Sequence, residues 1–215
     1  MKLTIVYDNN VYKKAIGLKS HWGFSCLIET KHDVILFDTG TNGKILLRNM
    51  DILGIDPYCI RKIVISHEHN DHNGGLSALA PFLGDIELYR LTKESPAENM
   101  HLMSAEESLE ITEGVYTTGM IENIIDEQSL VINGGKGWYV LVGCSHPGVE
   151  KILNVAKQQG NITGLIGGLH GFNNFSILKR LDLICPCHCT QHKREIKELY
   201  PRTYTESGVG KIIKI

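Results

Sequence analysis

The stretch Ser66-His67-Glu68-His69-Asn70-Asp71-His72-Asn73-Gly74-Gly75 decides how the rest of the chain is interpreted. It follows residues 61–65, a predicted strand whose last three residues are apolar and β-branched. His67 and His69 can point the same way from an extended segment, and Asp71 with a third histidine follows at once. This ligand set suits zinc or a related first-row divalent ion. Asp71 stands where His-Glu-x-x-His requires its second histidine, which excludes a helical thermolysin-type site.

Three later predicted strands also end in small residues followed by a histidine. The segments are Gly143-Cys144-Ser145-His146, Gly167-Gly168-Leu169-His170 and Pro186-Cys187-His188. Glycine and serine at such points let the backbone come close to a bound ion or substrate. The candidate metal ligands are therefore His67, His69, Asp71, His72, His146 and His188, with His170 as a further candidate.

The order of the expected elements predicts an α/β sandwich with mixed sheets, because strands and helices alternate with hairpins among them. Strands are expected over residues 2–7, 25–30, 33–37, 61–65, 85–90, 115–118, 129–132, 138–142, 162–166, 182–185 and 211–215. Helices are expected over residues 44–53, 76–83, 147–160 and 191–200. Residues 93–113 are polar and rich in Met and Glu, which favours a mobile loop or a cover over a site.

The composition is that of an ordinary globular protein, with 215 residues, 42% of them hydrophobic, and a net charge of −2. We expect a single domain over residues 1–215. The near-balance of charge argues against binding nucleic acid through bulk charge, and no apolar run approaches the roughly 20 residues of a membrane helix. The first residues are too soon polar for a signal peptide, so we expect a cytoplasmic protein.

The cysteines are expected to be reduced thiols rather than a disulfide framework, because the chain is expected to be cytoplasmic. Cys185, Cys187 and Cys189 could form a thiolate site with His188, but their alternate spacing puts them on the opposite face of a strand. We favour reduced thiols in the core or near the site. His21 and Trp22 precede a predicted strand, and either could contact a substrate.

His67, His69, Asp71 and His72 match the signature His-x-His-x-Asp-His, and on this basis the chain resembles the metallo-β-lactamase superfamily. Phe37-Asp38-Thr39-Gly40 is similar to a turn that precedes the first helix of that superfamily. The resemblance covers essentially the whole chain. It is closest to prokaryotic metal-dependent hydrolases that are similar to the archaeal dihydropterin–ribofuranosylaminobenzene phosphate synthases. The shared segments are Gly143–Gly148, Gly167–His170 and His188–Thr190.

The resemblance implies an αββα four-layer sandwich with two mixed β-sheets and a two-metal site at one edge. The implied ligands are His67, His69 and His146 for the first metal, and Asp71, His72 and His188 for the second. Many members also bridge the metals with an aspartate in the stretch that corresponds to Gly167–Gly171, where this chain has no carboxylate. Either the two metal positions are not both fully occupied, or His170 is a ligand in place of the bridging aspartate.

One or two divalent ions are expected, most favourably Zn²⁺, with Mn²⁺ or Fe²⁺ as alternatives. The iron-binding branch of the superfamily has a glutamate at the position of His69, so His69 favours zinc. Asp71 is the expected catalytic residue, which binds a metal and accepts a proton from water. Asp38 either hydrogen-bonds a ligand imidazole or caps a turn.

The expected function is a metal-dependent hydrolase that uses a metal-activated hydroxide on a small ester, lactone or phosphoester. A pterin-linked condensing enzyme on the same scaffold is the alternative. A phosphodiesterase or nuclease is disfavoured because the chain is short and lacks a basic patch. A non-catalytic metal-binding module is a further alternative. The expected partner is a small-molecule substrate, with no nucleic acid and no membrane, and a homo-oligomer stays open.

Overall fold

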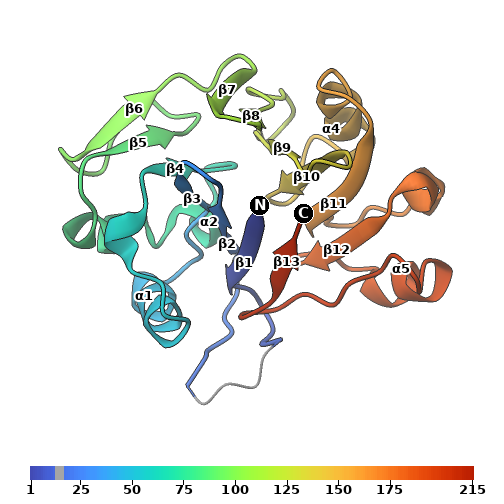
Figure 1. Cartoon of the computed structure of the whole chain (residues 1–215), viewed down its shortest axis with the longest axis horizontal. Helices are drawn as coiled ribbons and strands as arrows, with labels where there is room; N and C mark the ends of the chain where they lie inside the picture. The colour runs from blue at the N-terminus through green and yellow to red at the C-terminus, as the bar shows by residue number, and fades with distance from the viewer. Residues whose placement is uncertain (13–16) are drawn as a thin grey trace.

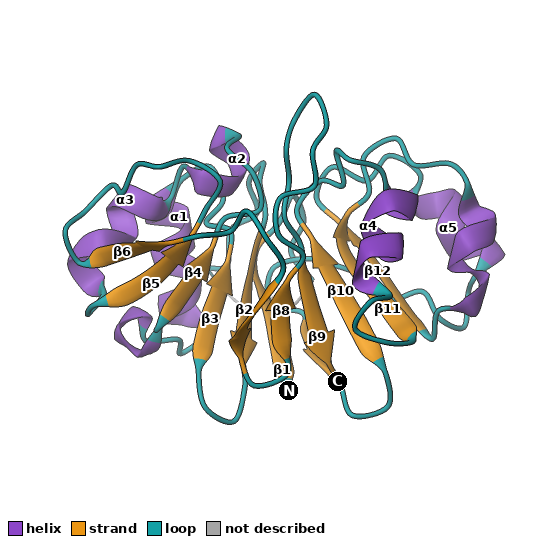
Figure 2. Ribbon diagram, turned by 90° about the horizontal axis from the view of Figure 1, so that it is seen from above, coloured by secondary structure: helices purple, strands orange, loops and turns teal. Residues whose placement is uncertain are grey.

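The computed structural model of the protein describes residues 1–12 and 17–215. Its strands form two sheets that face each other, and helices cover the outer side of each sheet (Figure 2). This confirms the α/β sandwich with mixed sheets that the elements predict and the αββα form that the resemblance implies. The chain ends lie close together (Figure 1), and the Met1 amino group donates a hydrogen bond to Ile215 O over 2.7 Å.

The first sheet has seven strands in the order β13-β1-β2-β3-β4-β5-β6. They are β1 (Lys2–Tyr7), β2 (Ser25–Glu29), β3 (Val34–Phe37), β4 (Lys62–Val64), β5 (Ile86–Tyr89), β6 (Met100–Met103) and β13 (Ile212–Lys214). The pairs from β3 to β6 are parallel, whereas the pairs among β13, β1, β2 and β3 are antiparallel. Phe37 pairs with Val64, and Val64 with Tyr89, so β3, β4 and β5 end level with one another.

The second sheet has six strands in the order β12-β11-β10-β9-β8-β7. They are β7 (Leu109–Thr112), β8 (Val115–Thr117), β9 (Leu130–Asn133), β10 (Trp138–Val142), β11 (Ile162–Gly168) and β12 (Leu183–Cys187). Strands β10, β11 and β12 are parallel, and the pairs from β7 to β10 are antiparallel. Gly167 pairs with both Val142 and Pro186, so the three parallel strands also end together.

The helices occupy the outer layers of the sandwich (Figure 2). They are α1 (Gly43–Ile52), α2 (Asn70–Asn73), α3 (Leu76–Leu79), α4 (Val149–Ala156) and α5 (Lys193–Leu199), with 3₁₀ turns η1 (Pro57–Cys59), η2 (Ala80–Phe82) and η3 (Phe175–Arg180). Asn42 caps α1 by accepting hydrogen bonds from Lys44 N and Ile45 N. Leu46 and Met50 lie on one face of α1 and are fully buried against the first sheet.

Three apolar clusters hold the layers together. One lies between the sheets and joins residues such as Phe24, Val64 and Leu141. The second packs α1 and α3 on the first sheet, and the third packs α4 and α5 on the second sheet. Burial of this apolar surface is the main favourable free-energy term that holds the two sheets against each other.

The carboxyl ends of the parallel strands in both sheets are followed by the segments that the sequence analysis singled out. Strand β4 leads to His67, β10 to His146, β11 to His170 and β12 to His188. Strands that run parallel and end level present their following turns at one edge of a sheet. The fold therefore concentrates these turns, and α2 among them, at one edge of the sandwich.

The structure corrects several sequence-based boundaries. The loop or cover expected over residues 93–113 contains strands β6 and β7, one on each sheet. Strand β6 is an edge strand of only four residues, Met100–Met103, whose His101, Leu102 and Met103 side chains are exposed, so it lacks the buried alternation that marks the other strands. Strands β11 and β12 run two residues further than expected, to Gly168 and Cys187, because parallel partners continue beside them. No helix of the described residues has the length and apolar character needed to cross a membrane.

Substitution of Gly40, in the turn after β3, tests how tightly side chains pack at this edge of the sandwich. Its φ of +65° is left-handed, and a Cβ there would lie 2.6 Å from Cγ of the buried Tyr7 ring. Gly54, beyond α1, has a similar φ of +70° but open space around it. Left-handed backbone costs an L residue about 1–2 kcal/mol. We expect Gly40→Ala to lower the free energy of unfolding clearly more than Gly54→Ala, measured by urea denaturation. Equal losses would show that the Tyr7 contact is loose.

Candidate metal centre

One group of imidazoles gathers around His67, which follows β4. His67 Nε2 lies 3.1 Å from His69 Nδ1. The His146 ring, from the turn after β10, has its centroid 4.7 Å from that of His67 and 5.0 Å from that of His69. His146 Nε2 is buried and has no hydrogen-bond partner. An unpaired buried polar atom is costly, so its lone pair facing other donor nitrogens suits a bound ion.

A second group lies directly beside the first. Asp71 Oδ2 is 3.1 Å from His188 Nε2 and 3.9 Å from His72 Nε2. The His72 and His188 ring centroids are 5.1 Å apart, and those of His67 and His72 are 4.1 Å apart. The six residues that the resemblance assigns to two metals are therefore together in space, although they come from turns more than 100 residues apart.

Cys144, which the sequence analysis did not single out as a ligand, lies between the two groups. Its Sγ is 3.2 Å from His72 Nε2. The donor atoms of His67, Cys144 and His146 lie within 4.8 Å of one another, and so do those of His72, Cys144 and His188. The signal for it in the sequence was its position at the end of a buried strand, the same signal that marked the histidines. A hydrogen bond with Cys189 and burial raise the pKa of the Cys144 thiol.

His170 and the late cysteines lie outside these groups. His170 is exposed, and its ring centroid is 5.1 Å from that of His146. Cys185 and Cys187 are buried in the cluster between the sheets. Cys189 is buried beyond the end of β12, with its Sγ 4.0 Å from Cys144 O. The structure thus has free thiols in the core and near the site, and no disulfide among the described cysteines.

Backbone strain is concentrated at these turns. The non-glycine residues with positive φ in the described part of the chain are Asp38, Ser145, His170 and His188. Left-handed backbone in such residues persists only where the surroundings enforce it, and it gathers at functional sites. All four belong to turns at the carboxyl ends of strands, which is where the imidazoles meet.

A buried carboxylate, Asp38, holds the first turn. Its Oδ1 accepts from Ser66 N over 2.7 Å, and its Oδ2 accepts from Ser66 Oγ over 2.9 Å and lies 2.7 Å from His72 Nδ1. Burial lowers the pKa of His72, but the Asp38 charge and hydrogen bond outweigh it, so that this pKa is raised. With Nδ1 engaged by Asp38, His72 presents Nε2 to the centre.

Glu127 plays the same part for the turn after β10, and sequence analysis missed it. Its Oε1 accepts from the amides of Gly143, Cys144 and Ser145 at 3.0 Å each, and Oε2 accepts from His146 N at 2.8 Å. Burial raises the pKa of Glu127, and the hydrogen bonds from the amides of His146, Ser145 and Cys144 oppose that shift. A carboxyl group surrounded only by N–H donors is best satisfied as the anion. No local pattern marks Glu127, because its partners lie 16 or more residues away.

Asp8 and Asn9, just after β1, hold the turn after β12. Asp8 Oδ2 accepts from His188 N over 3.1 Å, and Asn9 Nδ2 donates to His188 O over the same distance. His188 Nδ1 lies 3.0 Å from Asn9 Oδ1, which leaves Nε2 facing Asp71. The sequence analysis used Asp8 and Asn9 only as part of the early polar stretch that argues against a signal peptide.

Trp22 covers the second group from the solvent side. Its Nε1 donates to Asp71 Oδ2 over 2.8 Å, and its ring meets that of His188 edge-on with centroids 4.8 Å apart. The side chain is 56% exposed, so one part of the indole stays open to a bound molecule. His21, the other residue considered as a substrate contact, instead has its ring 6.2 Å from that of Tyr7.

The electrostatics keep most of the donor atoms unprotonated at neutral pH. Burial lowers the pKa of His67, and the neighbouring His72 and His146 lower it further. Burial, with His170 and His69 nearby, lowers the pKa of His146 to about 4. Burial raises the pKa of Asp71, but the His188 hydrogen bond and the field of His72 outweigh it and the pKa is lowered. Neutral imidazoles beside an ionised carboxylate are the form that binds a divalent ion.

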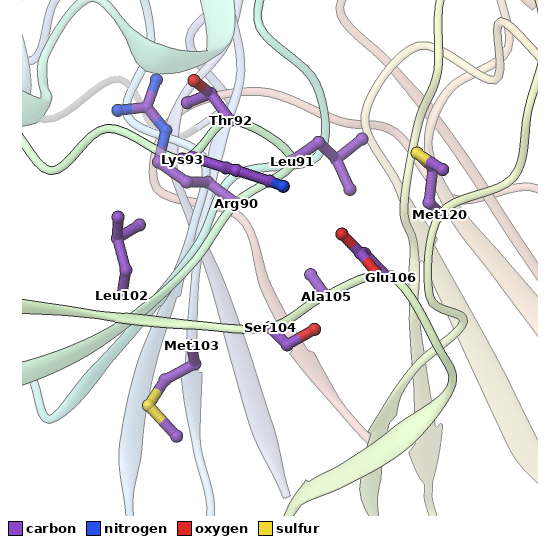
Figure 3. A pocket seen from close by; sticks show the side chains of 10 residues that line it. All are labelled: Arg90, Leu91, Thr92, Lys93, Leu102, Met103, Ser104, Ala105, Glu106 and Met120. Atoms are coloured by element: carbon purple, nitrogen blue, oxygen red, sulfur yellow. The ribbon is translucent and has the colours of Figure 1, made fainter.

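A pocket of about 340 Å³ lies at the carboxyl ends of β5 and β6, and none of the candidate ligands lines it. Leu91, Leu102, Met103 and Met120 give it apolar walls, and Lys93 and Glu106 extend toward its open space (Figure 3). Arg90 is among the lining residues, and its guanidinium pairs with Glu68, the residue between His67 and His69. This ion pair joins one wall of the pocket to the turn that carries the histidines.

The Glu127 carboxylate provides a test of how this turn is held. In Glu127→Gln an amide nitrogen has to face one of the four backbone donors, which removes charged hydrogen bonds worth about 1–3 kcal/mol. We expect a lower melting temperature without metal and at least about tenfold weaker Zn²⁺ affinity in chelator competition. The exposed Glu122→Gln is the control and should change neither quantity. Wild-type zinc affinity in Glu127→Gln would contradict this role.

Comparisons with known proteins agree with this geometry. A family model of the metallo-beta-lactamase superfamily matches residues 23–151, which include the turns of Asp38, His67 and His146. The chain is 27% identical to 7,8-dihydropterin-6-methyl-4-(beta-D-ribofuranosyl)-aminobenzene-5'-phosphate synthase of Methanocaldococcus jannaschii, over 91% of this chain and 90% of that protein. A ribonuclease Z of Pyrococcus abyssi is 36% identical over 44% of this chain and 27% of that protein.

Solved structures share the whole fold. The crystal structure of Tm1679, a metal-dependent hydrolase of the beta-lactamase superfamily, matches with a TM-score of 0.78 at 23% identity and covers 100% of this chain and 99% of that one. Zn(2+)-bound PqqB from Methylobacterium extorquens matches with a TM-score of 0.65 at 11% identity, over 100% of both chains. From the family match and the shared fold, this chain belongs to the metallo-beta-lactamase superfamily.

Proposed function

We propose that this protein is a metal-dependent hydrolase that acts on a small ester, lactone or phosphoester. The observation that carries the proposal is the meeting of five imidazoles and Asp71 at one edge of the sandwich, in two adjacent groups. Such a complete donor set at the ends of strands usually accompanies chemistry. Membership of a superfamily composed mostly of metal-dependent hydrolases supports the same conclusion.

The donor set fits two divalent ions. His67 Nε2, His69 Nδ1 and His146 Nε2 would hold one ion, and Asp71 Oδ2, His72 Nε2 and His188 Nε2 would hold the other. Nitrogen donors with one carboxylate favour Zn²⁺, with Mn²⁺ and Fe²⁺ as alternatives. When bound, such ions lower the pKa of water from 15.7 toward about 7 and polarise the oxygen of the substrate.

The chain's own residues orient the donors and handle the proton. Asp38 and Asn9 each engage the Nδ1 of an imidazole, which fixes the ring and the nitrogen it presents. Asp71 is ionised, receives a hydrogen bond from Trp22 and lies 3.1 Å from His188 Nε2, so it is placed to accept a proton from water at the centre. The exposed indole of Trp22 and the pocket beside Arg90 would contact the rest of the substrate.

A condensing enzyme on the same scaffold is the second candidate, and the full-length similarity to the dihydropterin synthase favours it. Both candidates need the same metal centre. They differ in whether water alone can act as the second reactant. A hydrolase turns over a simple activated ester or phosphodiester alone, whereas a condensing enzyme requires a second substrate. The partial match to ribonuclease Z adds no proposal of nucleic-acid cleavage, because it spans 44% of this chain.

His69→Ala tests the proposal most simply. Without Nδ1 of His69 the first ion loses one of its three donors, so we expect kcat/KM to fall at least about 100-fold while the melting temperature of the metal-free protein changes little. The assay is a screen of p-nitrophenyl esters, lactones and bis-p-nitrophenyl phosphate with Zn²⁺, Mn²⁺ and Fe²⁺. His101→Ala, on edge strand β6, is the matched control. Wild-type turnover in His69→Ala, or no turnover of the wild type with any metal, would contradict the proposal.

His170→Ala separates the six assigned ligands from the neighbouring histidine. His170 is exposed and lies outside both donor groups, so we expect the variant to keep two zinc ions per chain by elemental analysis. His146→Ala, measured beside it, should bind less zinc because it removes a donor of the first group. A loss of one ion in His170→Ala would return His170 to the ligand set.

A further inference from the structure

Cys144 is a nucleophilic side chain at the centre to which the proposed function gives no role. It is 3% exposed, and its Sγ lies 3.2 Å from His72 Nε2. Its donor atom belongs both to the group with His67 and His146 and to the group with His72 and His188. A single sulfur atom is therefore within reach of both proposed ion positions.

The charges at the centre leave a place for a second anion. Among the six residues proposed to hold two divalent ions, only Asp71 is negatively charged, and the segment 167–171 contains no acidic residue. Asp38 and Glu127 are acidic, but their oxygens are occupied by hydrogen bonds to Ser66, to His72 and to backbone amides. A thiol at a divalent ion is deprotonated outright and would supply the missing negative donor.

The distances match those of two donors on one ion. With Zn–N near 2.0–2.1 Å and Zn–S near 2.3 Å at tetrahedral angles, a nitrogen and a sulfur on the same zinc lie about 3.5 Å apart. The Cys144 Sγ to His72 Nε2 distance of 3.2 Å is close to this value. The four amide hydrogen bonds to Glu127 fix the backbone of the turn that carries Cys144, so the sulfur is held in place.

We propose that Cys144 binds as a thiolate shared between the two ions, and that its proton is released to solvent when they bind. This inference rests on the two-ion site of the proposed function. It assigns to the chain a soft sulfur ligand in addition to the imidazoles and Asp71. Cys189 is the natural comparison, because it is buried beside Cys144 but belongs to neither donor group.

Titration of the metal-free protein with cobalt(II) chloride tests the assignment by absorption rather than by activity. We expect a near-ultraviolet sulfur-to-cobalt charge-transfer band that grows through the first and the second equivalent. The band should be the same in Cys189→Ser and absent in Cys144→Ser, whose cobalt affinity should fall at least about tenfold. Equilibrium dialysis on each variant gives the number of ions bound.

The outcomes separate this inference from the function on which it rests. If wild-type protein binds two cobalt ions without the band, the thiolate assignment is wrong and the hydrolase proposal stands. A band that survives in Cys144→Ser, disappears in Cys189→Ser or is complete after one equivalent also overturns the shared thiolate. Failure of the wild type to bind cobalt would reject the metal site itself.

A measurement on the wild type alone covers the case in which Cys144→Ser does not fold. X-ray absorption of the zinc-loaded protein should show a sulfur scatterer at about 2.3 Å from zinc. A shell of nitrogen and oxygen alone would overturn the assignment.

Discussion

The buried carboxylates that hold the strand-end turns are the interaction on which the whole centre depends. Asp38 holds the turn after β4, Glu127 the turn after β10, and Asp8 the turn after β12. Each carboxylate accepts a hydrogen bond from the backbone N–H of a candidate ligand or of the residue next to one. Charged hydrogen bonds of this kind are stronger than neutral ones, and in a buried site they cost little reorganisation once formed. They explain how turns with left-handed residues such as Ser145 and His188 persist.

The two sheets are joined beside these turns. Gln128, next to Glu127 and from the second sheet, donates its N–H to Ser66 O over 2.8 Å, and Asp38 of the first sheet accepts from Ser66 N. Asp8, from the first sheet, reaches His188 at the end of the second sheet. The centre is thus assembled where the two sheets meet, and a change in their relative position would separate the donors within each group, because each group takes residues from both sheets. This is why the apolar cluster between the sheets matters for the chemistry as well as for stability.

The sequence predicted the sandwich and most strands because apolar runs, turn residues and the His-rich stretch are local signals. The sequence also indicated which strand ends carry the candidate ligands, since each of these histidines follows a buried strand. It did not find Glu127 or the Asp8–Asn9 pair, whose partners are remote in the chain, nor Cys144, whose role follows only from its neighbours in space. The segment over residues 93–113 was misjudged because its strands β6 and β7 have only four residues each, lie at sheet edges and stand among polar residues.

The central claim is that two ions are held at adjacent positions by donors from three separate turns. Anomalous diffraction at the zinc edge from crystals of the zinc-loaded protein measures this directly. The account predicts two peaks, about 3.5–4 Å apart, one among His67, His69 and His146 and the other among Asp71, His72 and His188. A single peak elsewhere on the molecule, or no peak at this edge of the sandwich, would contradict it.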